Sequence, residues 1–259
     1  MSFVPRPVVL VTGGARRVGR AIALELAAQG YDVAVHSHHD GEECQDTLRA
    51  ARALGARSEA FVADLAVEAD CEALLPAVTT AMGRVDALVN NASRFDDDRV
   101  ADCSQASMAA HWQVNTAAPV LLARALHAHV AGTGRTGCVV NLLDQKLWNP
   151  NPDYFSYTLS KAALQAATTL LAQALVPAVR VAGVAPGVTL PSGTMNEAEF
   201  ARAHAMTPLG CGSTPQDVAR AVRFLIESPA ITGTTLLVDG GQHLAPQPRD
   251  VQFLVRQGG

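Results

Sequence analysis

The sequence predicts an α/β fold in which a doubly wound parallel sheet of about seven strands carries helices on both faces. First, short apolar runs alternate with helical patterns along nearly the whole chain, as strands and crossover helices do in such a sheet. Second, 259 residues with 49% hydrophobic content can bury one sizeable core, and α/β folds of this length commonly stay one domain. Third, a glycine-rich turn follows the first apolar run, at residues 12–19.

We expect one domain over residues 1–244 and a C-terminal tail over residues 245–259. Strands are expected at residues 7–11, 32–36, 58–62, 85–89, 137–143, 179–185 and 235–238, with helices between them. The long irregular stretch at residues 188–214 follows the C-terminal end of a strand and is expected to be the substrate loop. The tail contains Pro246, Pro248 and a closing Gly-Gly. Disorder is the simpler expectation for this tail, and a subunit clasp is the alternative.

Composition argues against several classes of protein. A net charge of -4 gives no reason to expect a nucleic-acid partner. No apolar stretch is long enough to cross a bilayer, and residues 1–7 lack the apolar core of a signal peptide, so we expect a cytoplasmic protein with no membrane partner. The five cysteines are scattered without metal-ligand spacing, and the eight histidines form no evident pair on a helix face. We therefore expect reduced thiols and no metal.

The glycine-rich turn predicts a phosphate-binding cradle. An apolar strand at residues 8–11 enters it, and an amphipathic helical pattern at residues 20–29 leaves it. Glycines let the backbone approach a pyrophosphate, whose charge sits at the helix N-terminus. The turn consists of Thr12, Gly13, Gly14, Ala15, Arg16, Arg17, Val18 and Gly19.

The choice of cofactor is indicated by two stretches. Folds that select NAD usually carry an acidic residue at the end of the second strand, but here that position reads His36, Ser37, His38. Arg16 and Arg17 could bind a 2'-phosphate through charge-assisted hydrogen bonds, which favours NADPH. On this interpretation, replacing Arg17 with glycine would weaken NADPH binding far more than NADH binding. The alternative is that both arginines are solvated residues at a helix start.

A proton-donating group is predicted from three residues, Asp144, Tyr157 and Lys161. Tyr157 and Lys161 are four residues apart in a helical pattern, so they share one helix face. A nearby ammonium favours phenolate, so we expect Lys161 to lower the Tyr157 pKa. An exposed helical face is the alternative for the Tyr-Lys pair alone.

Taken in order, these motifs resemble the short-chain dehydrogenase/reductase family from about residue 7 to residue 244. Further elements of the resemblance are Asn90, Asn91 and Ala92, then Asn115, Pro186 and Gly187, and finally Asp239, Gly240 and Gly241. The family resemblance implies a Rossmann-type fold with cofactor contacts from Asn91, Ala92, Ser93, Tyr157, Lys161, Pro186 and Gly187. It also implies that Lys161 binds the nicotinamide ribose and that Asn115 organises a water leading from Lys161 to solvent. Otherwise, Asn115 is a polar residue of a subunit-facing helix.

Two further implications concern the adenine site and assembly. Asp64 and Leu65 would contact adenine, although a solvated strand-end carboxylate is nearly as good an interpretation of Asp64. The family also implies a homotetramer. In agreement, the helical stretches at residues 107–131 and 155–175 are apolar on more than one face, with Leu121, Leu122, Leu164, Leu170 and Leu171.

Asp144 departs from the common family pattern, in which a serine at this position donates to a substrate carbonyl. An ionised carboxylate only accepts hydrogen bonds and would repel a developing alkoxide, so ketone reduction fits poorly. Reduction of a C=N bond fits better, because a carboxyl and a phenol that share a proton can protonate the nitrogen. An exposed strand-end residue is the alternative for Asp144.

The set of Asp144, Tyr157 and Lys161 narrows the resemblance to pteridine reductases and dihydromonapterin reductases. Residues 16–19, 36–38 and 90–95 support it. The resemblance implies that Phe95 stacks on a pterin and that Ser93 bonds cofactor phosphate or pterin substituents. Candidate pocket walls in the substrate loop are Leu190, Met195, Phe200 and Met206.

The expected activity is NADPH-dependent hydride transfer to a pterin C=N bond. The first alternative is an NADPH-dependent reductase of a ketone or quinone. The second alternative is a non-catalytic regulator that binds NADPH.

Overall fold

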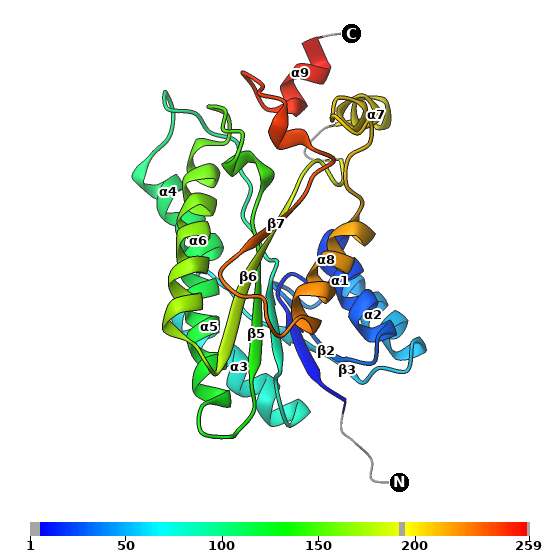
Figure 1. Cartoon of the computed structure of the whole chain (residues 1–259), viewed down its shortest axis with the longest axis vertical. Helices are drawn as coiled ribbons and strands as arrows, with labels where there is room; N and C mark the ends of the chain where they lie inside the picture. Colours follow the sequence, from blue (N-terminus) through cyan, green and yellow to red (C-terminus); the bar gives the residue numbers. More distant parts are fainter. Residues whose placement is uncertain (1–5, 192–194, 258–259) are drawn as a thin grey trace.

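The structure is a computed structural model and describes residues 6–191 and 195–257. Its seven strands form one parallel sheet in the order β3-β2-β1-β4-β5-β6-β7 (Figure 1). The strands are β1 (Val8–Val11), β2 (Asp32–Ser37), β3 (Ser58–Val62), β4 (Ala87–Asn90), β5 (Gly137–Leu142), β6 (Val179–Pro186) and β7 (Thr235–Val238). The predicted Rossmann-type fold is confirmed, and every expected strand is present within about two residues.

Helices cover both faces of this sheet (Figure 1). The first group is α1 (Arg17–Ala28), α2 (Glu42–Ala53) and α8 (Pro215–Glu227), and the opposite group is α3 (Glu68–Met82), α4 (Gln105–Trp112), α5 (Ala118–Val130) and α6 (Phe155–Ala174). A π-helical turn at Gln113–Ala117 joins α4 to α5, and short 3-10 helices occupy Gln145–Leu147 and Gln242–Leu244.

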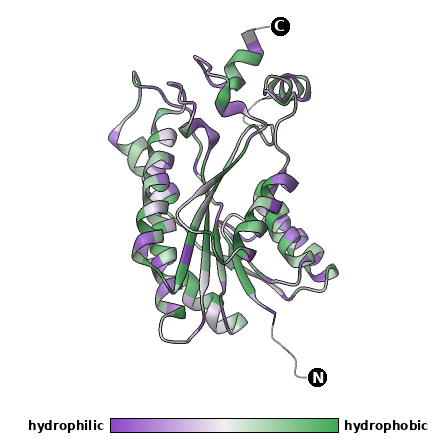
Figure 2. Cartoon of the chain, viewed as in Figure 1, coloured by the Kyte–Doolittle hydropathy of each residue, from purple (hydrophilic) through white to green (hydrophobic). Residues whose placement is uncertain are grey.

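Strand alternation divides the core into two layers. In β1, Val9 and Val11 pack with α1, α2 and α8, while Val8 and Leu10 pack with α3 and α5. Successive strand side chains point to opposite faces, so a strand buried on both sides is apolar throughout. Hydrophobic colouring accordingly follows most of the central strands in Figure 2.

The sheet topology defines a crevice for ligands. The chain winds outward in one direction from β1 to β3 and then crosses to β4 on the other side of β1. In doubly wound sheets, ligands bind at this switch point, outside the carboxyl ends of the strands. The predicted site residues after β1, β4, β5 and β6 all follow carboxyl ends at this edge.

Two expectations about the C-terminal half are wrong. The stretch at 188–214 contains a helix, α7 (Glu197–Ala205), whose start is stabilised by a capping box between Asn196 and Glu199. The tail forms α9 (Val251–Gln257), which packs on α7 beyond the carboxyl ends of the strands (Figure 1). Burial of Val251 and Val255 offsets the entropy that disorder would have retained.

Several other features concern only the described residues. No helix among them is long and apolar enough to cross a membrane. The same residues contain no group of three metal-ligating side chains. All five cysteines are free thiols.

Candidate active site

The glycine-rich turn between β1 and α1 is compact because its glycines leave no room for side chains. Gly13 has a φ of +60°, a conformation that favours glycine. A Cβ at Gly19 would lie 2.1 Å from the Gly13 carbonyl oxygen, so any other residue would force the turn open. The first turn of α1 contains no acidic residue. The cradle therefore suits an anion at the helix N-terminus.

The buried side chain of His36 is hydrogen-bonded to this turn. Its Nδ1 accepts a hydrogen bond from Gly13 N at 3.1 Å, and its Nε2 lies 3.1 Å from Ala63 O. This pattern assigns the tautomer that carries its proton on Nε2. Burial lowers the pKa of His36, which is 2% exposed, so the ring stays neutral. Both ring nitrogens of His36 are therefore engaged within the protein, and its side chain shapes the turn.

Thr12 and Asn91 join the ends of β1 and β4. Thr12 Oγ1 accepts hydrogen bonds from Asn91 N and Ala92 N, both at 3.0 Å. Asn91 Nδ2 donates to Thr12 O at 2.9 Å and to Gly13 O at 3.1 Å. The structure thus brings these predicted residues together at the switch point.

Arg16 and Arg17 diverge. Arg16 points toward α2, where its guanidinium lies 3.6 Å from the Glu43 carboxylate. Arg17 adopts a φ of +52° and donates a hydrogen bond of 2.8 Å to Pro191 O in the predicted substrate loop. Only Arg16 therefore faces the side of β2. The neighbouring Val18 packs against the core.

The ends of β2 and β3 form the predicted adenine side of the crevice. Ser37 Oγ donates to His39 O at 2.8 Å, and His38 Nδ1 lies 3.6 Å from an Asp64 carboxylate oxygen. Leu65 is buried in the core beside this pair. The partly exposed imidazole of His38 and the hydroxyl of Ser37 lie at one edge of the sheet.

Asp144 and Tyr157 form the predicted pair. Tyr157 O–H donates to Asp144 Oδ2 at 2.8 Å, and the other carboxylate oxygen accepts from Lys146 N at 2.8 Å. Loss of hydration raises the pKa of Asp144, and its two hydrogen bonds offset only part of that effect. The pair therefore retains protons at a higher pH than an isolated carboxylate would.

Lys161 does not act on Tyr157 as expected. Its ammonium donates to Leu142 O at 2.7 Å and lies 5.8 Å from the centre of the Tyr157 ring. Burial lowers the pKa of Lys161 to about 8. Burial and the adjacent Asp144 carboxylate raise the pKa of Tyr157 well above its usual value, so the expected lowering is wrong in this structure. The partner that dominates the phenol is an anion, because Asp144 is closer than Lys161.

Asn115 fixes the loop after β4 to α6. Its Nδ2 donates to Arg94 O and to Ser160 Oγ, each at 2.9 Å. Its Oδ1 accepts from Arg94 N at 2.8 Å and from Ser93 Oγ at 3.2 Å. Both donors and both acceptor positions of the amide are occupied, so the side chain acts as a clamp. The backbone of Asn115 lies in the π-helical turn.

Phe95 lies beside the reactive pair. Its ring meets the edge of the Tyr157 ring at a centroid distance of 4.6 Å and an angle of 87°. It also stacks on Tyr154 at 4.2 Å and 15°. Phe95 is 40% exposed, so part of the ring is open to a flat ligand next to Tyr157.

The segment after β6 also lies at the carboxyl edge of the sheet. A Cβ at Gly187 would lie 2.8 Å from Gln242 Oε1, which accepts a hydrogen bond from Val188 N. Pro186 and Leu190 are partly exposed on either side of it. Met195 and Phe200 pack into the α7–α9 cluster. Met206 remains 39% exposed.

Sequence reasoning missed a group of residues behind the reactive pair. Five of them are linked by hydrogen bonds or a cation–ring contact, namely Lys146, Asp153, Tyr154, Asp250 and Gln252. The sixth, Asp98, accepts a hydrogen bond from Ser156 N at the start of α6. Lys146 and Tyr154 could have been noticed from their closeness in sequence to Asp144 and Tyr157. Asp250 and Gln252 carried no local signal, because only the folded tail brings them there.

This chain is similar to known reductases in sequence and in fold. A family model described as enoyl-(acyl carrier protein) reductase matches residues 13–243. The crystal structure of the alternative dihydrofolate reductase 1 FolM from Brucella canis, complexed with NADP, has a TM-score of 0.87 and 39% identity, covering 95% of this chain and 98% of that one.

Relatives of this chain are described with different enzymatic activities. A putative ketoacyl reductase 2 of the granaticin polyketide synthase from Streptomyces violaceoruber is 36% identical, over 92% of this chain and 96% of that protein. Pteridine reductase 1 from Leishmania tarentolae is 33% identical over the same shares. With the family model spanning most of the chain and the fold and motifs described above, the protein belongs to the short-chain dehydrogenase/reductase family and is an oxidoreductase of that family related to pterin reductases.

Proposed function

We propose that this protein is an NADPH-dependent pterin reductase that transfers hydride to a C=N bond of a pterin ring. The observation that carries the proposal is the 2.8 Å hydrogen bond between Tyr157 and Asp144. An acid pair of this kind can protonate a ring nitrogen, whereas an ionised carboxylate beside a ketone oxygen would oppose the developing charge. The NADP bound to the Brucella canis relative supports the choice of cofactor.

The residues present fit a dinucleotide. The turn at residues 12–19 keeps its compact shape because a Cβ at Gly13, Gly14 or Gly19 would collide with neighbouring atoms, and α1 offers its N-terminus without an acidic side chain. Arg16, with Ser37 and His38, would hold the 2'-phosphate, while Asp64 and Leu65 would border the adenine. Further contacts would come from Asn91, Ala92, Ser93, Tyr157, Lys161, Pro186 and Gly187. When bound, NADPH supplies the hydride.

Proton delivery is the part that this chain's own residues perform. Tyr157 holds its proton firmly, because burial and Asp144 raise its pKa. Asp144, whose pKa is also raised by burial, can take up a proton of its own from solvent and pass that proton to a ring nitrogen placed beside Phe95, which leaves the carboxylate hydrogen-bonded to the Tyr157 hydroxyl. Lys161 contributes an ammonium with a pKa of about 8 at the same face of α6.

The substrate slot is proposed to lie against Phe95, with Ser93 at its edge. The exposed part of the Phe95 ring would cover one face of a flat heterocycle. Arg17 and Leu190 would border the entrance, because Arg17 is bonded to Pro191 of the substrate loop. The relationship to pteridine reductase 1 supports this assignment.

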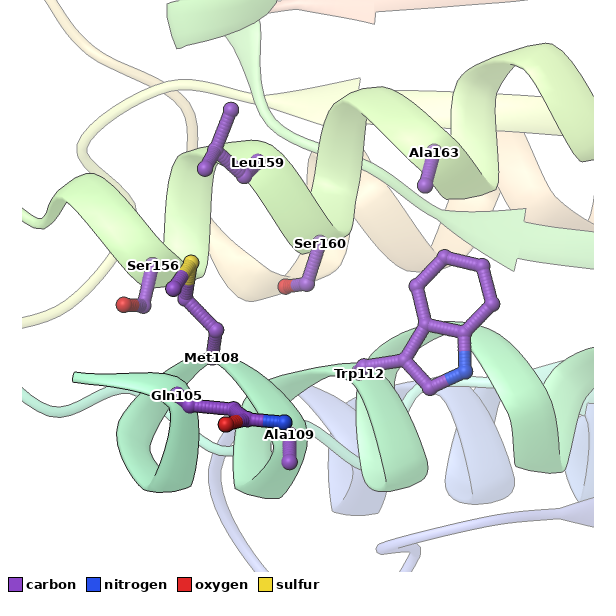
Figure 3. Close-up of a pocket in the computed structure, with 8 residues that line it drawn as sticks. All are labelled: Gln105, Met108, Ala109, Trp112, Ser156, Leu159, Ser160 and Ala163. Carbon is purple, nitrogen blue, oxygen red and sulfur yellow. The ribbon is translucent and has the colours of Figure 1, made fainter.

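The proposal extends to assembly and location. We infer a homotetramer in which a second copy of this chain covers the outer face of α4 and α6. A groove of about 410 Å³ lies there, lined by Met108, Trp112 and Leu159 among others (Figure 3). In Figure 3, Met108 points from α4 toward α6. A cytoplasmic location is also proposed, because reduced thiols persist in that compartment.

Substrate turnover is the direct test. NADPH oxidation would be measured with dihydrobiopterin, dihydromonapterin, folate and a panel of ketones and quinones. The proposal expects the highest kcat/KM with a pterin. The relative described as a ketoacyl reductase makes a ketone the competing substrate, and faster ketone turnover would replace the proposal. NADPH binding without any turnover would favour the regulator.

A further inference from the structure

The aromatic ring next to the reactive pair rests on a second ring. Phe95 stacks on Tyr154 at 4.2 Å and 15°, and Tyr154 in turn lies 6.1 Å from the Phe253 ring at 26°. Tyr154 is 5% exposed, whereas Phe95 is 40% exposed. The plane that Phe95 offers to a ligand is therefore set by a buried ring behind it.

Tyr154 is held from several directions. Its hydroxyl donates to Gln252 Oε1 at 2.7 Å, and the Lys146 ammonium lies 5.3 Å from its ring centre. Its φ is +54°, a conformation that residues other than glycine adopt only when their surroundings enforce it. The contacts with Gln252 and Phe253 come from the C-terminal segment, nearly 100 residues away in sequence.

Ionic contacts hold the C-terminal segment in this place. Asp153, a buried carboxylate, accepts hydrogen bonds from Arg249 Nε at 2.7 Å and from Asp250 N at 2.8 Å. The buried Lys146 ammonium donates to Asp153 O at 2.6 Å and to Asp250 Oδ2 at 3.3 Å. Docking of α9 on α7 uses a separate set of contacts, namely the apolar cluster of Val251 and Val255 and a hydrogen bond of 2.9 Å from Arg202 to Val255 O. Charged groups buried at this depth must be paired, so the segment is held in one register.

We propose that Tyr154 and Gln252 are positioning residues that set the plane of Phe95, which makes residues 249–253 part of the substrate site. This inference rests on the proposed function in one respect, namely that the substrate is a flat heterocycle stacked on Phe95. Gln252 acts through the Tyr154 hydroxyl, and Tyr154 acts through its stacked ring. Neither residue touches the proton that is transferred.

Two single variants and their combination test the coupling. Tyr154→Phe keeps the ring and removes the hydroxyl, while Gln252→Leu removes the acceptor. Each should raise KM for the pterin by roughly five- to tenfold, the equivalent of one buried hydrogen bond, with kcat and the KM for NADPH nearly unchanged. The double variant should be no worse than the poorer single variant, because both remove the same bond. Gln29→Leu, on the exposed end of α1, is the matched control.

The outcomes separate this inference from the proposed function. If the variants lose thermal stability yet keep the wild-type pterin KM, or if their effects on KM add, the positioning role is overturned. A crystal structure of Gln252→Leu gives a readout that needs no substrate: the Phe95 ring should leave its position over Tyr154, and an unchanged stack contradicts the inference. If the wild type reduces no pterin, the proposed function fails, and the crystal comparison still decides the role of the tail.

Discussion

Asp144 is the residue on which the proposed choice of reaction depends. A serine at this position would donate a hydrogen bond to a substrate oxygen, whereas the Asp144 carboxylate accepts one from Tyr157 at 2.8 Å. The fold and the Tyr-Lys helix are compatible with either arrangement. We therefore propose that this residue decides which substrate atom the site can protonate.

Replacing Asp144 with serine should shift activity between substrate classes. We expect pterin kcat/KM to fall by about 10²-fold or more, the usual contribution of general acid catalysis, while NADPH binding changes little. Any activity on simple ketones should be preserved or should rise, because a hydroxyl can donate to an alkoxide. Both kcat/KM values would be measured on one purified variant. Undiminished pterin reduction would disprove the proposed role of Asp144.

The two adjacent arginines should differ in their effect on cofactor choice. Arg17→Gly removes a side chain bonded to Pro191 from a backbone position with φ of +52°, which glycine adopts without strain. We therefore expect this variant to keep the NADPH preference and to alter pterin KM instead. Arg16→Ala should weaken NADPH binding roughly ten- to a hundredfold relative to NADH. Fluorescence titration with both cofactors measures the ratio. If Arg17→Gly instead loses affinity for NADPH but not for NADH, Arg17 is the residue that binds the 2'-phosphate.

At the scale of elements, the helix that carries Tyr157 and Lys161 is stabilised from outside. Asp98, in the loop after β4, accepts hydrogen bonds from Ser156 N at 2.8 Å and from the Ser156 hydroxyl, and its backbone carbonyl accepts from Phe155 N at 3.0 Å. The residue preceding α6, Tyr154, forms no side-chain cap of its own. The loop that bears Phe95 therefore also caps the catalytic helix.

Removing this cap should lower both stability and turnover. Asp98→Ala should cost about 1 to 2 kcal/mol, which corresponds to a Tm decrease of about 2 to 8 °C, and should lower kcat by loosening Tyr157. Burial opposes ionisation of Asp98, but hydrogen bonds from Ser156 and Ser107 outweigh it and lower the pKa. The stabilisation is therefore complete above the ordinary carboxyl pKa and is lost as pH falls through the lower folded value.

Calorimetry at neutral and acid pH measures the effect. The difference in Tm between wild type and Asp98→Ala should narrow below about pH 4. Asp98→Asn retains an oxygen acceptor, so its Tm at neutral pH should lie between those of the wild type and Asp98→Ala. A Tm difference that does not depend on pH would show that the carboxylate charge has no part in the cap.

At the scale of the whole molecule, the site exists because parallel strands end at one edge of the sheet. Loops after β1, β4, β5 and β6 meet there, and the C-terminal segment is hydrogen-bonded to the stretch after β5. The outer faces of α4 and α6 lie outside this arrangement and keep large apolar side chains exposed, among them Trp112 at 52% and Leu159 at 47%. Such a surface is typical of a subunit interface.

A charge placed on that surface should prevent association. Leu159→Glu should shift the protein from tetramer to smaller species in light scattering at micromolar concentration, because the carboxylate would be buried in the interface. Leu54→Glu is the matched control, since Leu54 is also 47% exposed but lies at the end of α2. A wild type that is monomeric under these conditions would overturn the tetramer.

Local patterns were enough to predict the seven strands, the glycine-rich turn and the spacing of Tyr157 and Lys161, since each depends on neighbours in sequence. The meeting of Asp144 with Tyr157 was also foreseen, because one residue follows a strand and the other opens the helix beside it. Only the tertiary structure shows that His36 is hydrogen-bonded to the glycine-rich turn, Arg17 to Pro191, and Tyr154 to Gln252. Those contacts join residues 23 to 174 positions apart, and their energies depend on burial and on paired charges, which no local pattern encodes.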